Sequence, residues 1–171
     1  PRPTLPDVLM YADILKDNDT IRVYTTHLQS LQLGKFDYDR IRKIRGGDDS
    51  LVANSKTILG KIKKGFSRRS IQADVVKEVM GVSPHPYLLC ADLNDVPNSY
   101  AYYTVKGKLQ DAFLKKGFGM GRTFSGLAPT LRIDFIFADH HFRIQQFNRV
   151  MKNLSDHYML VADVELKAPI P

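Results

Sequence analysis

The most constraining feature of this sequence is a short, uninterrupted apolar run at residues 87–91, Tyr-Leu-Leu-Cys-Ala. It follows a proline-containing breaker at residues 83–86 and ends at Asp92. A run of this length without polar alternation is typical of a strand covered on both faces, as in layered α/β folds. We therefore expect a buried central strand here, with Cys90 as a small buried side chain that carries no chemistry.

The patterns before this run predict a hairpin and a long helical region. Residues 9–15 and 20–28 are strand-like, and a polar turn at residues 16–19 joins them. From residue 37 to residue 80 the spacing is helical, with possible breaks at Gly46-Gly47 and at Gly65. The apolar positions that define this spacing are Leu51, Ile58, Ile62, Phe66, Ile71, Val75 and Val79.

The patterns after the run predict one short helix and three strands. We expect the helix over residues 98–106, with Ser99 as its cap. The expected strands cover residues 131–137, 142–151 and 158–166. This order of elements favours a single α/β or α+β layered domain over residues 1–171, rather than a helix bundle or an all-β sandwich.

Composition limits the class of protein further. A single cysteine excludes an intrachain disulfide framework and a cysteine-based zinc site. The formal net charge of +7 predicts attraction to polyanions such as nucleic acid, phosphoinositides or anionic membrane surfaces, without choosing among them. No segment has the length of a transmembrane helix and no signal sequence is present, so we expect a soluble domain. The sequence does not determine its cellular compartment or its oligomeric state.

Several polar side chains lie at a strand end, within a strand or in the loop leading into one. Ligand groups in α/β folds commonly occupy the carboxyl ends of strands, so these side chains are candidates for a functional site. They are His27, Asp92, Asn94, Asp134, Asp156 and His157.

Each candidate also has an ordinary structural interpretation. A histidine at a strand end, such as His27, is more often structural or exposed than catalytic. Asp92 and Asn94 are equally typical of an Asx-rich turn. Asp134 can pair with a cation on the solvated face of its strand, and Asp156-His157 can form a polar loop.

Four segments in order resemble the motifs of the endonuclease/exonuclease/phosphatase superfamily, the group that contains deoxyribonuclease I. They are Thr26-His27-Leu28, Ala91-Asp92-Leu93-Asn94, Arg132-Ile133-Asp134-Phe135-Ile136 and Ser155-Asp156-His157-Tyr158-Met159. Two positions depart from the family pattern, with Ala91 in place of Gly and Met159 in place of Pro. Neither departure removes a functional group.

The resemblance implies part of a two-sheet, four-layer α/β sandwich of the deoxyribonuclease I type. Family members begin with a strand that carries an Asn and a second strand that ends in Gln-Glu, and nothing before His27 matches either element. We therefore expect this chain to be the C-terminal portion of the domain, without the N-terminal strands and without one glutamate of the metal site.

The resemblance also implies a role for each candidate. Asp156 would bind Mg²⁺ or Mn²⁺, and His157 would contact the scissile phosphate with Asp134 fixing its tautomer. Asp92 would position or deprotonate the attacking water, and Asn94 would bind that water or a phosphate oxygen. His27 would be a phosphate ligand or the acid for the leaving group.

The implied activity is metal-dependent hydrolysis of a phosphoester by in-line attack of an activated water. The expected substrate is nucleic acid, a phosphorylated small molecule or a phosphorylated lipid headgroup. The alternative is a non-catalytic polyanion-binding module of the same fold, which the charge of +7 favours.

Three further features have weaker interpretations. The glycine-rich residues 117–121 are interpreted as a surface loop. His85, His140 and His141 show no partners at metal-ligand spacing and are interpreted as turn residues. The basic residues between 61 and 69 predict a solvated helix face that can also grip an anionic substrate.

Overall fold

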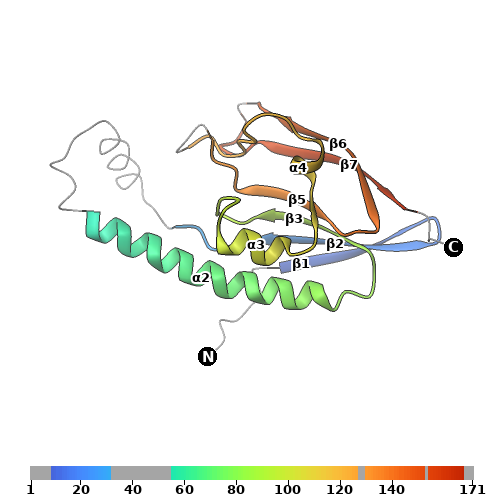
Figure 1. Ribbon diagram of the computed structural model, residues 1–171, viewed down its shortest axis with the longest axis horizontal. Helices are drawn as coiled ribbons and strands as arrows, with labels where there is room; N and C mark the ends of the chain where they lie inside the picture. Colours follow the sequence, from blue (N-terminus) through green and yellow to red (C-terminus); the bar gives the residue numbers. More distant parts are fainter. Residues whose placement is uncertain (1–8, 32–54, 127–129, 153, 168–171) are drawn as a thin grey trace.

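A computed structural model describes residues 9–31, 55–126, 130–152 and 154–167 of the protein. Its strands form a five-stranded sheet in the order β1-β2-β3-β5-β4 and a two-stranded sheet of β6 and β7 (Figure 1). The elements are β1 (Leu9–Lys16), β2 (Asp19–His27), α2 (Ser55–Gly81), β3 (Tyr87–Asp92), α3 (Tyr100–Lys106), β4 (Gln110–Asp111), α4 (Ala112–Lys116), β5 (Asp134–Ala138), β6 (Phe142–Val150) and β7 (Met159–Leu166).

The centre of the larger sheet is β3, as the apolar run predicts. It pairs in parallel with β2 and antiparallel with β5, so both of its edges are hydrogen-bonded. The parallel connection from β2 to β3 includes α2, which is the crossover helix that a parallel pair requires. The predicted hairpin is confirmed, with β1 and β2 antiparallel from Leu9↔Thr26 to Lys16↔Asp19.

The described elements form three layers (Figure 1). Helices α2 and α3 cover one face of the five-stranded sheet, and β6 with β7 covers part of the other face. Between the helices and the sheet lies a core of buried side chains that includes Tyr24, Leu89, Val76, Tyr102, Phe135 and Phe137. The α/β class and the two-sheet arrangement are thus confirmed.

Helix α2 differs from its prediction in two ways. It runs without a break through Gly65, where an added Cβ would lie 2.8 Å from the Leu31 side chain. Its buried stripe contains Arg69 and not the predicted Phe66, Ile71 and Val79, whose exposures are 50%, 46% and 38%. The predicted helical residues 37–54 lie outside the described residues.

A buried ion pair explains this shift of the helix face. Arg69 is 1% exposed, and its Nε donates to Asp95 Oδ2 at 2.9 Å. Its Nη1 donates to the carbonyl oxygen of Gln29 at 3.1 Å. Because a periodicity of apolar residues assigns charged side chains to solvent, it cannot place a buried arginine correctly.

The expectation that Cys90 is buried is wrong, because its side chain is exposed. Its neighbours Leu89 and Ala91 point toward the helices and are buried. Side chains alternate along a strand, so Cys90 points toward the other face, which β6 and β7 do not cover at this position.

A second buried ion pair lies between α4 and the residues that lead into β5. Arg132 Nη1 donates to Asp111 Oδ2 at 2.8 Å, and the hydroxyl of Tyr102 donates to the same oxygen at 2.8 Å. The other oxygen of Asp111 accepts hydrogen bonds from the backbone of Phe113 and Leu114, which caps α4. Burial, together with the Asp111 carboxylate, raises the pKa of Tyr102, so its hydroxyl stays protonated and donates.

The short helix α3 confirms its predicted cap, because Ser99 accepts a hydrogen bond from the Tyr102 amide. Among the described helices, none combines the length and apolar character that a membrane crossing requires.

Candidate active site

Strand register brings three of the six candidate residues to one edge of the larger sheet. His27 and Asp92 are partners at the ends of the parallel strands β2 and β3. Asp92 is in turn the partner of Asp134, the first residue of β5. The three side chains therefore occupy adjacent strands at the same level of the sheet.

His157 joins this group from the loop that precedes β7. Its Nδ1 lies 3.0 Å from both carboxylate oxygens of Asp134. An imidazole whose Nδ1–H donates to a carboxylate keeps the lone pair of Nε2 free to accept a proton or bind a ligand. The expected pairing of a carboxylate behind His157 is therefore present in the structure.

The loop residues Thr123 and Phe124 hold the Asp134–His157 pair in place. Thr123 Oγ1 accepts hydrogen bonds from the backbone amides of Ile133 and Asp134 at 3.0 and 3.1 Å. The next residue, Phe124, forms a β-bridge with His157, and the two rings lie 4.9 Å apart between centroids. These contacts fix the backbone of Asp134 and the ring plane of His157.

The surroundings of Asp92 raise the pKa of its carboxyl group. Burial raises the pKa of Asp92, and the negative charge of Asp134 raises it further. The amide of Asn94, which donates to Asp92 Oδ1 at 2.9 Å, lowers it in part. A carboxylate with a raised pKa is a better proton acceptor at neutral pH than an exposed one.

His27 is the most exposed of the four grouped residues. Its Nε2 lies 3.5 Å from Asp92 Oδ2, and its side chain is 67% exposed. This position leaves the imidazole facing solvent beside the carboxylate.

Asn94 shapes the loop that follows β3. Its backbone has a φ of 48°, a left-handed conformation that turns the chain sharply at this point. Its Nδ2 donates to the carbonyl oxygen of Leu28 at 3.0 Å, which ties the ends of β2 and β3 together. The next residue, Asp95, is the buried partner of Arg69, so α2 anchors the same loop.

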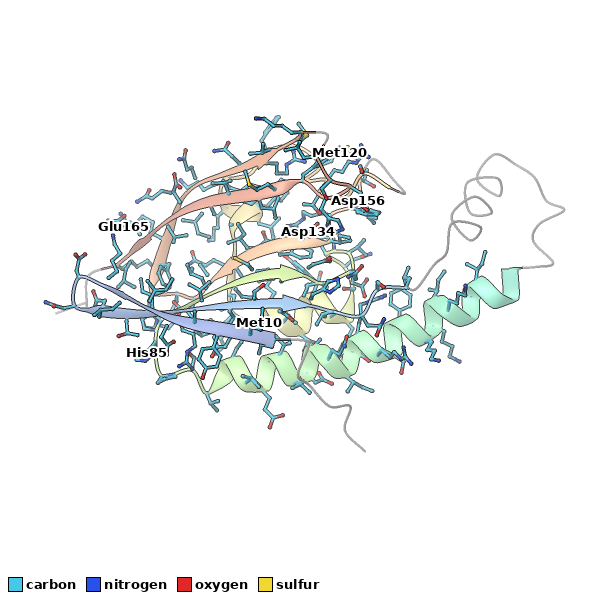
Figure 2. All side chains as sticks on the ribbon, turned by 180° about the vertical axis from the view of Figure 1, so that it is seen from behind. Met10, His85, Met120, Asp134, Asp156 and Glu165 are labelled. Carbon is cyan, nitrogen blue, oxygen red and sulfur yellow. The ribbon has the colours of Figure 1, made fainter. Side chains whose placement is uncertain are left out.

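The carboxylate of Asp156 is not part of the cluster around Asp134. The backbone carbonyl of Asp156 accepts hydrogen bonds from the amide and hydroxyl of Ser125, and its Oδ1 lies 3.3 Å from Ser155 Oγ. Figure 2 shows Asp156 and Asp134 toward the same end of the sheets. The sequence prediction that Asp156 binds the metal stays a prediction.

At this end of the sheet, Asp92, Asp134 and His157 offer ligand atoms that lie within 4.8 Å of one another. Two carboxylates suit a hard divalent cation, because Mg²⁺ usually takes one or two protein carboxylates and completes its shell with water and phosphate. The donor set of this site therefore fits Mg²⁺ or Mn²⁺.

An open cleft of about 390 Å³ leads to this group. His27, Asp92 and Asp134 lie in its wall, and Cys90 and Leu160 line it further along. The cleft lies between the uncovered face of the larger sheet and β7. A ligand in this cleft has access to both carboxylates.

Comparison with known proteins decides the family. Residues 65–157 match the profile of the Endonuclease/Exonuclease/phosphatase family, which is more than half of the chain. The chain belongs to the endonuclease/exonuclease/phosphatase family. No curated protein matches the chain significantly.

Several solved structures share the fold of the chain. A conserved protein of unknown function from Enterococcus faecalis superimposes with a TM-score of 0.66 at 18% identity, over 96% of this chain and 61% of its own. The catalytic domain of human Nocturnin, with a bound sulfate, gives a TM-score of 0.58 at 15% identity, over 93% and 52% of the two chains.

A mannosyl-6-phosphatase from Bacteroides thetaiotaomicron superimposes with a TM-score of 0.56 at 17% identity, over 88% of this chain and 53% of its own. The chain therefore spans between half and about three-fifths of the length of these three structures. At such low identities the likeness shows the fold alone.

Sequence reasoning missed the residues that support the site from behind. Thr123 and Phe124 carry no motif and become visible only through their contacts with Asp134 and His157. The periodicity of apolar residues also did not reveal the buried Arg69–Asp95 pair, although Asp95 directly follows the candidate residue Asn94 in the sequence. Each depends on contacts between residues far apart in the sequence.

Proposed function

We propose that the protein is a metal-dependent hydrolase of phosphoester bonds. The observation that carries this proposal is the contact of His157 Nδ1 with both oxygens of Asp134, beside a half-buried Asp92 with a raised pKa. In-line attack on a phosphoester requires a positioned water, neutralised charge on the phosphoryl oxygens and help for the leaving oxygen. The residues at this sheet edge offer a group for each requirement.

Asp92 accepts the proton of the attacking water in this proposal. Its burial favours proton uptake, and the Asn94 amide fixes one of its oxygens at 2.9 Å. The other oxygen lies 3.5 Å from His27 Nε2, so it faces the open side of the site. Asn94 holds the same loop in position and presents its side-chain amide near the water or a phosphate oxygen.

His157 contacts the phosphoryl group through Nε2. Asp134 accepts the Nδ1 proton and stabilises the positive charge that the ring gains if it takes up a proton. Phe124 restricts rotation of the ring through its edge contact. On the other side of Asp92, His27 is exposed and serves as a phosphate ligand or as the proton donor to the leaving oxygen.

Asp156 would hold the metal from the loop before β7, next to the group of Asp92, Asp134 and His157, in which Asp134 keeps its place behind His157. When bound, Mg²⁺ or Mn²⁺ supplies Lewis-acid polarisation of the phosphoryl oxygen. The residues of the chain then position the water, orient the phosphoryl group and move protons at Asp92 and His27.

The proposed substrates are nucleic acids and phosphorylated small molecules or lipid headgroups. The structures that share the fold include a mannosyl-6-phosphatase from Bacteroides thetaiotaomicron and human Nocturnin with a bound sulfate, which supports an anionic substrate. The net charge of +7 supports the binding of a polyanionic substrate.

A substrate panel with the full-length protein tests the proposal. Phosphate or alcohol release from a single-stranded DNA, an RNA, a sugar phosphate and an inositol phosphate is measured with Mg²⁺ and with EDTA. We expect turnover of at least one class with Mg²⁺ and none with EDTA. Salt-sensitive binding of these polyanions without any turnover would replace the proposal by the non-catalytic binding module.

A further inference from the structure

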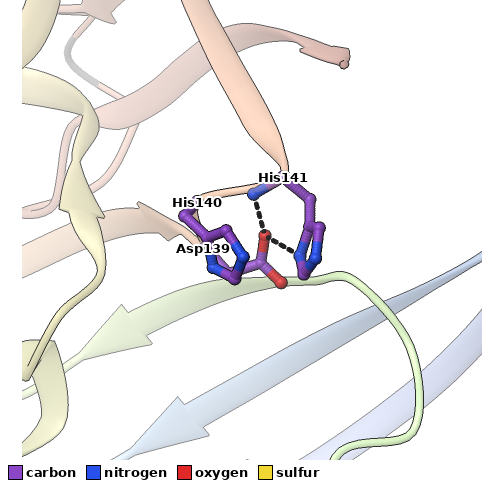
Figure 3. A group of neighbouring side chains, drawn as sticks. All are labelled: Asp139, His140 and His141. Atoms are coloured by element: carbon purple, nitrogen blue, oxygen red, sulfur yellow. Dashed lines mark hydrogen bonds and ion pairs between the residues drawn. The ribbon is translucent and has the colours of Figure 1, made fainter. Parts of the chain in front are cut away.

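A second cluster of potential metal ligands lies in the turn between β5 and β6. It consists of Asp139, His140 and His141, whose ligand atoms lie within 4.8 Å of one another (Figure 3). Asp139 Oδ1 is 3.1 Å from His141 Nδ1, and the rings of the two histidines lie 3.8 Å apart between centroids. The turn itself is as predicted, but the expectation that these histidines lack partners is wrong.

Backbone hydrogen bonds hold this cluster in place. Asp139 Oδ2 accepts the amide proton of Tyr87 at 2.8 Å, and Asp139 Oδ1 accepts that of His141 at 2.8 Å. Lys167 donates through Nζ to the carbonyl oxygen of His140 at 2.7 Å and through its amide to that of His141 at 2.8 Å. The donor atoms are therefore brought together by the fold before any ligand binds, which lowers the entropic cost of binding.

The spacing of the donors matches a small divalent cation. Two donors at about 2.0 Å from a tetrahedral zinc ion lie about 3.3 Å from each other. Asp139 Oδ1 and His141 Nδ1 are already 3.1 Å apart, so an ion can replace the proton that links them. The ring of His140, tilted by 38° against that of His141, supplies a second imidazole whose ligand atom lies within 4.8 Å of the others.

Exposure allows an ion to reach the cluster. The side chain of His141 is 49% exposed, whereas that of Asp139 is only 7% exposed and lies against the protein. The three residues line an open cavity of about 390 Å³, with His85 and Lys108 in its wall. One side of the cluster is thus fixed and the other is accessible.

We propose that Asp139, His140 and His141 form a binding site for a transition-metal ion of the Zn²⁺ type. Imidazole nitrogen favours zinc, nickel and copper over Mg²⁺, which prefers oxygen donors only. The site is separate from the Asp92–Asp134 group, because Ala138 and Asp134 are the two ends of β5. Four strand steps separate these ends, or about 14 Å.

Bound metal would connect the β5–β6 turn to the rest of the domain through the Asp139–Tyr87 contact. Asp139 Oδ2 holds the first residue of β3, and the carbonyl of Asp139 accepts a hydrogen bond from Gln110 Nε2 at 2.9 Å. An ion on Asp139 therefore stabilises a junction of β3, β4 and β5 at the end of the sheet remote from the catalytic group.

Calorimetric titration of Zn²⁺ into the full-length protein tests this site. The buffer contains excess Mg²⁺, so that the carboxylates at Asp92 and Asp134 do not compete for zinc. We expect one Zn²⁺ per chain, with affinity reduced at least about tenfold in His140→Ala and in His141→Ala. His85→Ala is the matched control, because His85 lines the same cavity but is not in the cluster, and its affinity should stay within about twofold of the wild type.

Three results would overturn the proposal. They are absence of Zn²⁺ binding by the wild type, unchanged affinity in the His140→Ala/His141→Ala double variant, and loss of the bound Zn²⁺ in His157→Ala. Equal thermal melting of wild type and variants without metal checks that the substitutions leave the fold intact. Because Asp139 caps the turn, it is not substituted in this test.

Discussion

Replacing Arg132 by methionine should destabilise the protein strongly, because it leaves a buried carboxylate without its cation. Arg132 is 4% exposed and donates to Asp111 Oδ2 at 2.8 Å. Its guanidinium carbon also lies 4.7 Å from the centroid of the Phe113 ring and 4.8 Å from that of Phe135. The substitution therefore removes a buried ion pair together with three cation–π contacts, the third of them over the Tyr102 ring at 5.8 Å.

The expected magnitude follows from what remains around Asp111. Removing one partner of a buried ion pair costs about 3–5 kcal/mol. Asp111 keeps the hydroxyl of Tyr102 and the amides of Phe113 and Leu114, and methionine preserves much of the packed volume. The lower end of the range therefore applies, about 3 kcal/mol, equivalent to a fall in Tm of about 6–12 °C for a domain of this size.

Urea unfolding followed by circular dichroism measures this loss of free energy. The matched control is Arg22→Met, which removes a more exposed pair with Asp13, whose side chains are 13% and 37% exposed against 5% and 1% in the Arg132–Asp111 pair, and should change stability much less. The double variant Arg132→Met/Asp111→Asn should recover part of the loss, because the uncompensated charge is gone. An unfolding free energy for Arg132→Met within about 1 kcal/mol of the wild type would refute the reasoning.

Three further predictions concern the site and its supports. Asp92→Asn should raise stability relative to the wild type at neutral pH. The pKa of Asp92 is raised in the folded state, so the wild type loses stability as the pH rises above about 4. The difference in urea midpoint between Asp92→Asn and the wild type should therefore grow from about pH 4 to about pH 7. Asp134→Asn should lower Mg²⁺-dependent turnover by about 100-fold or more and should redistribute the tautomers of His157, which ¹⁵N NMR measures. A fall in turnover of less than threefold would contradict the orienting role of Asp134. Ser99→Ala should cost about 1 kcal/mol in urea unfolding, because the cap hydrogen bond to the Tyr102 amide is lost, and Ser99→Thr should retain most of it.

Local patterns predicted most strands correctly, because alternation of apolar and polar residues and continuous apolar runs directly reflect which faces of a strand are covered. The hairpin of β1 and β2 and the central β3 are examples. The short β4 and α4 were missed because each has at most five residues, and Asp111, which caps α4, is positioned by Arg132. Such elements depend on contacts distant in sequence.

Two predictions of side-chain burial were wrong, one because a charged side chain is buried and the other because part of a sheet face is left uncovered. Arg69 lies in the buried stripe of α2 because Asp95 compensates its charge, which no apolar periodicity reveals. Cys90 was expected inside because its run is uniformly apolar, yet the second sheet leaves its face open. Composition of a strand cannot show how far a second layer extends.

For the site, the order of motifs selected all six candidates, and strand register explains why His27, Asp92 and Asp134 meet. The addition of His157 to this group could not be derived from spacing, because its position depends on Phe124 and Thr123. The partner of His141 was overlooked although Asp139 is only two residues away, since a turn residue gives no periodic signal.

The most direct test of the proposed active site is the Mg²⁺-dependent rate of phosphoester hydrolysis by His157→Ala. The full-length wild type, His157→Ala and the control His85→Ala are compared on the substrate that the panel identifies, after circular dichroism shows equal folding. We expect His157→Ala to lose at least about 100-fold in rate while His85→Ala keeps the wild-type rate. A rate for His157→Ala equal to that of the wild type would contradict a catalytic role for the Asp92, Asp134 and His157 group.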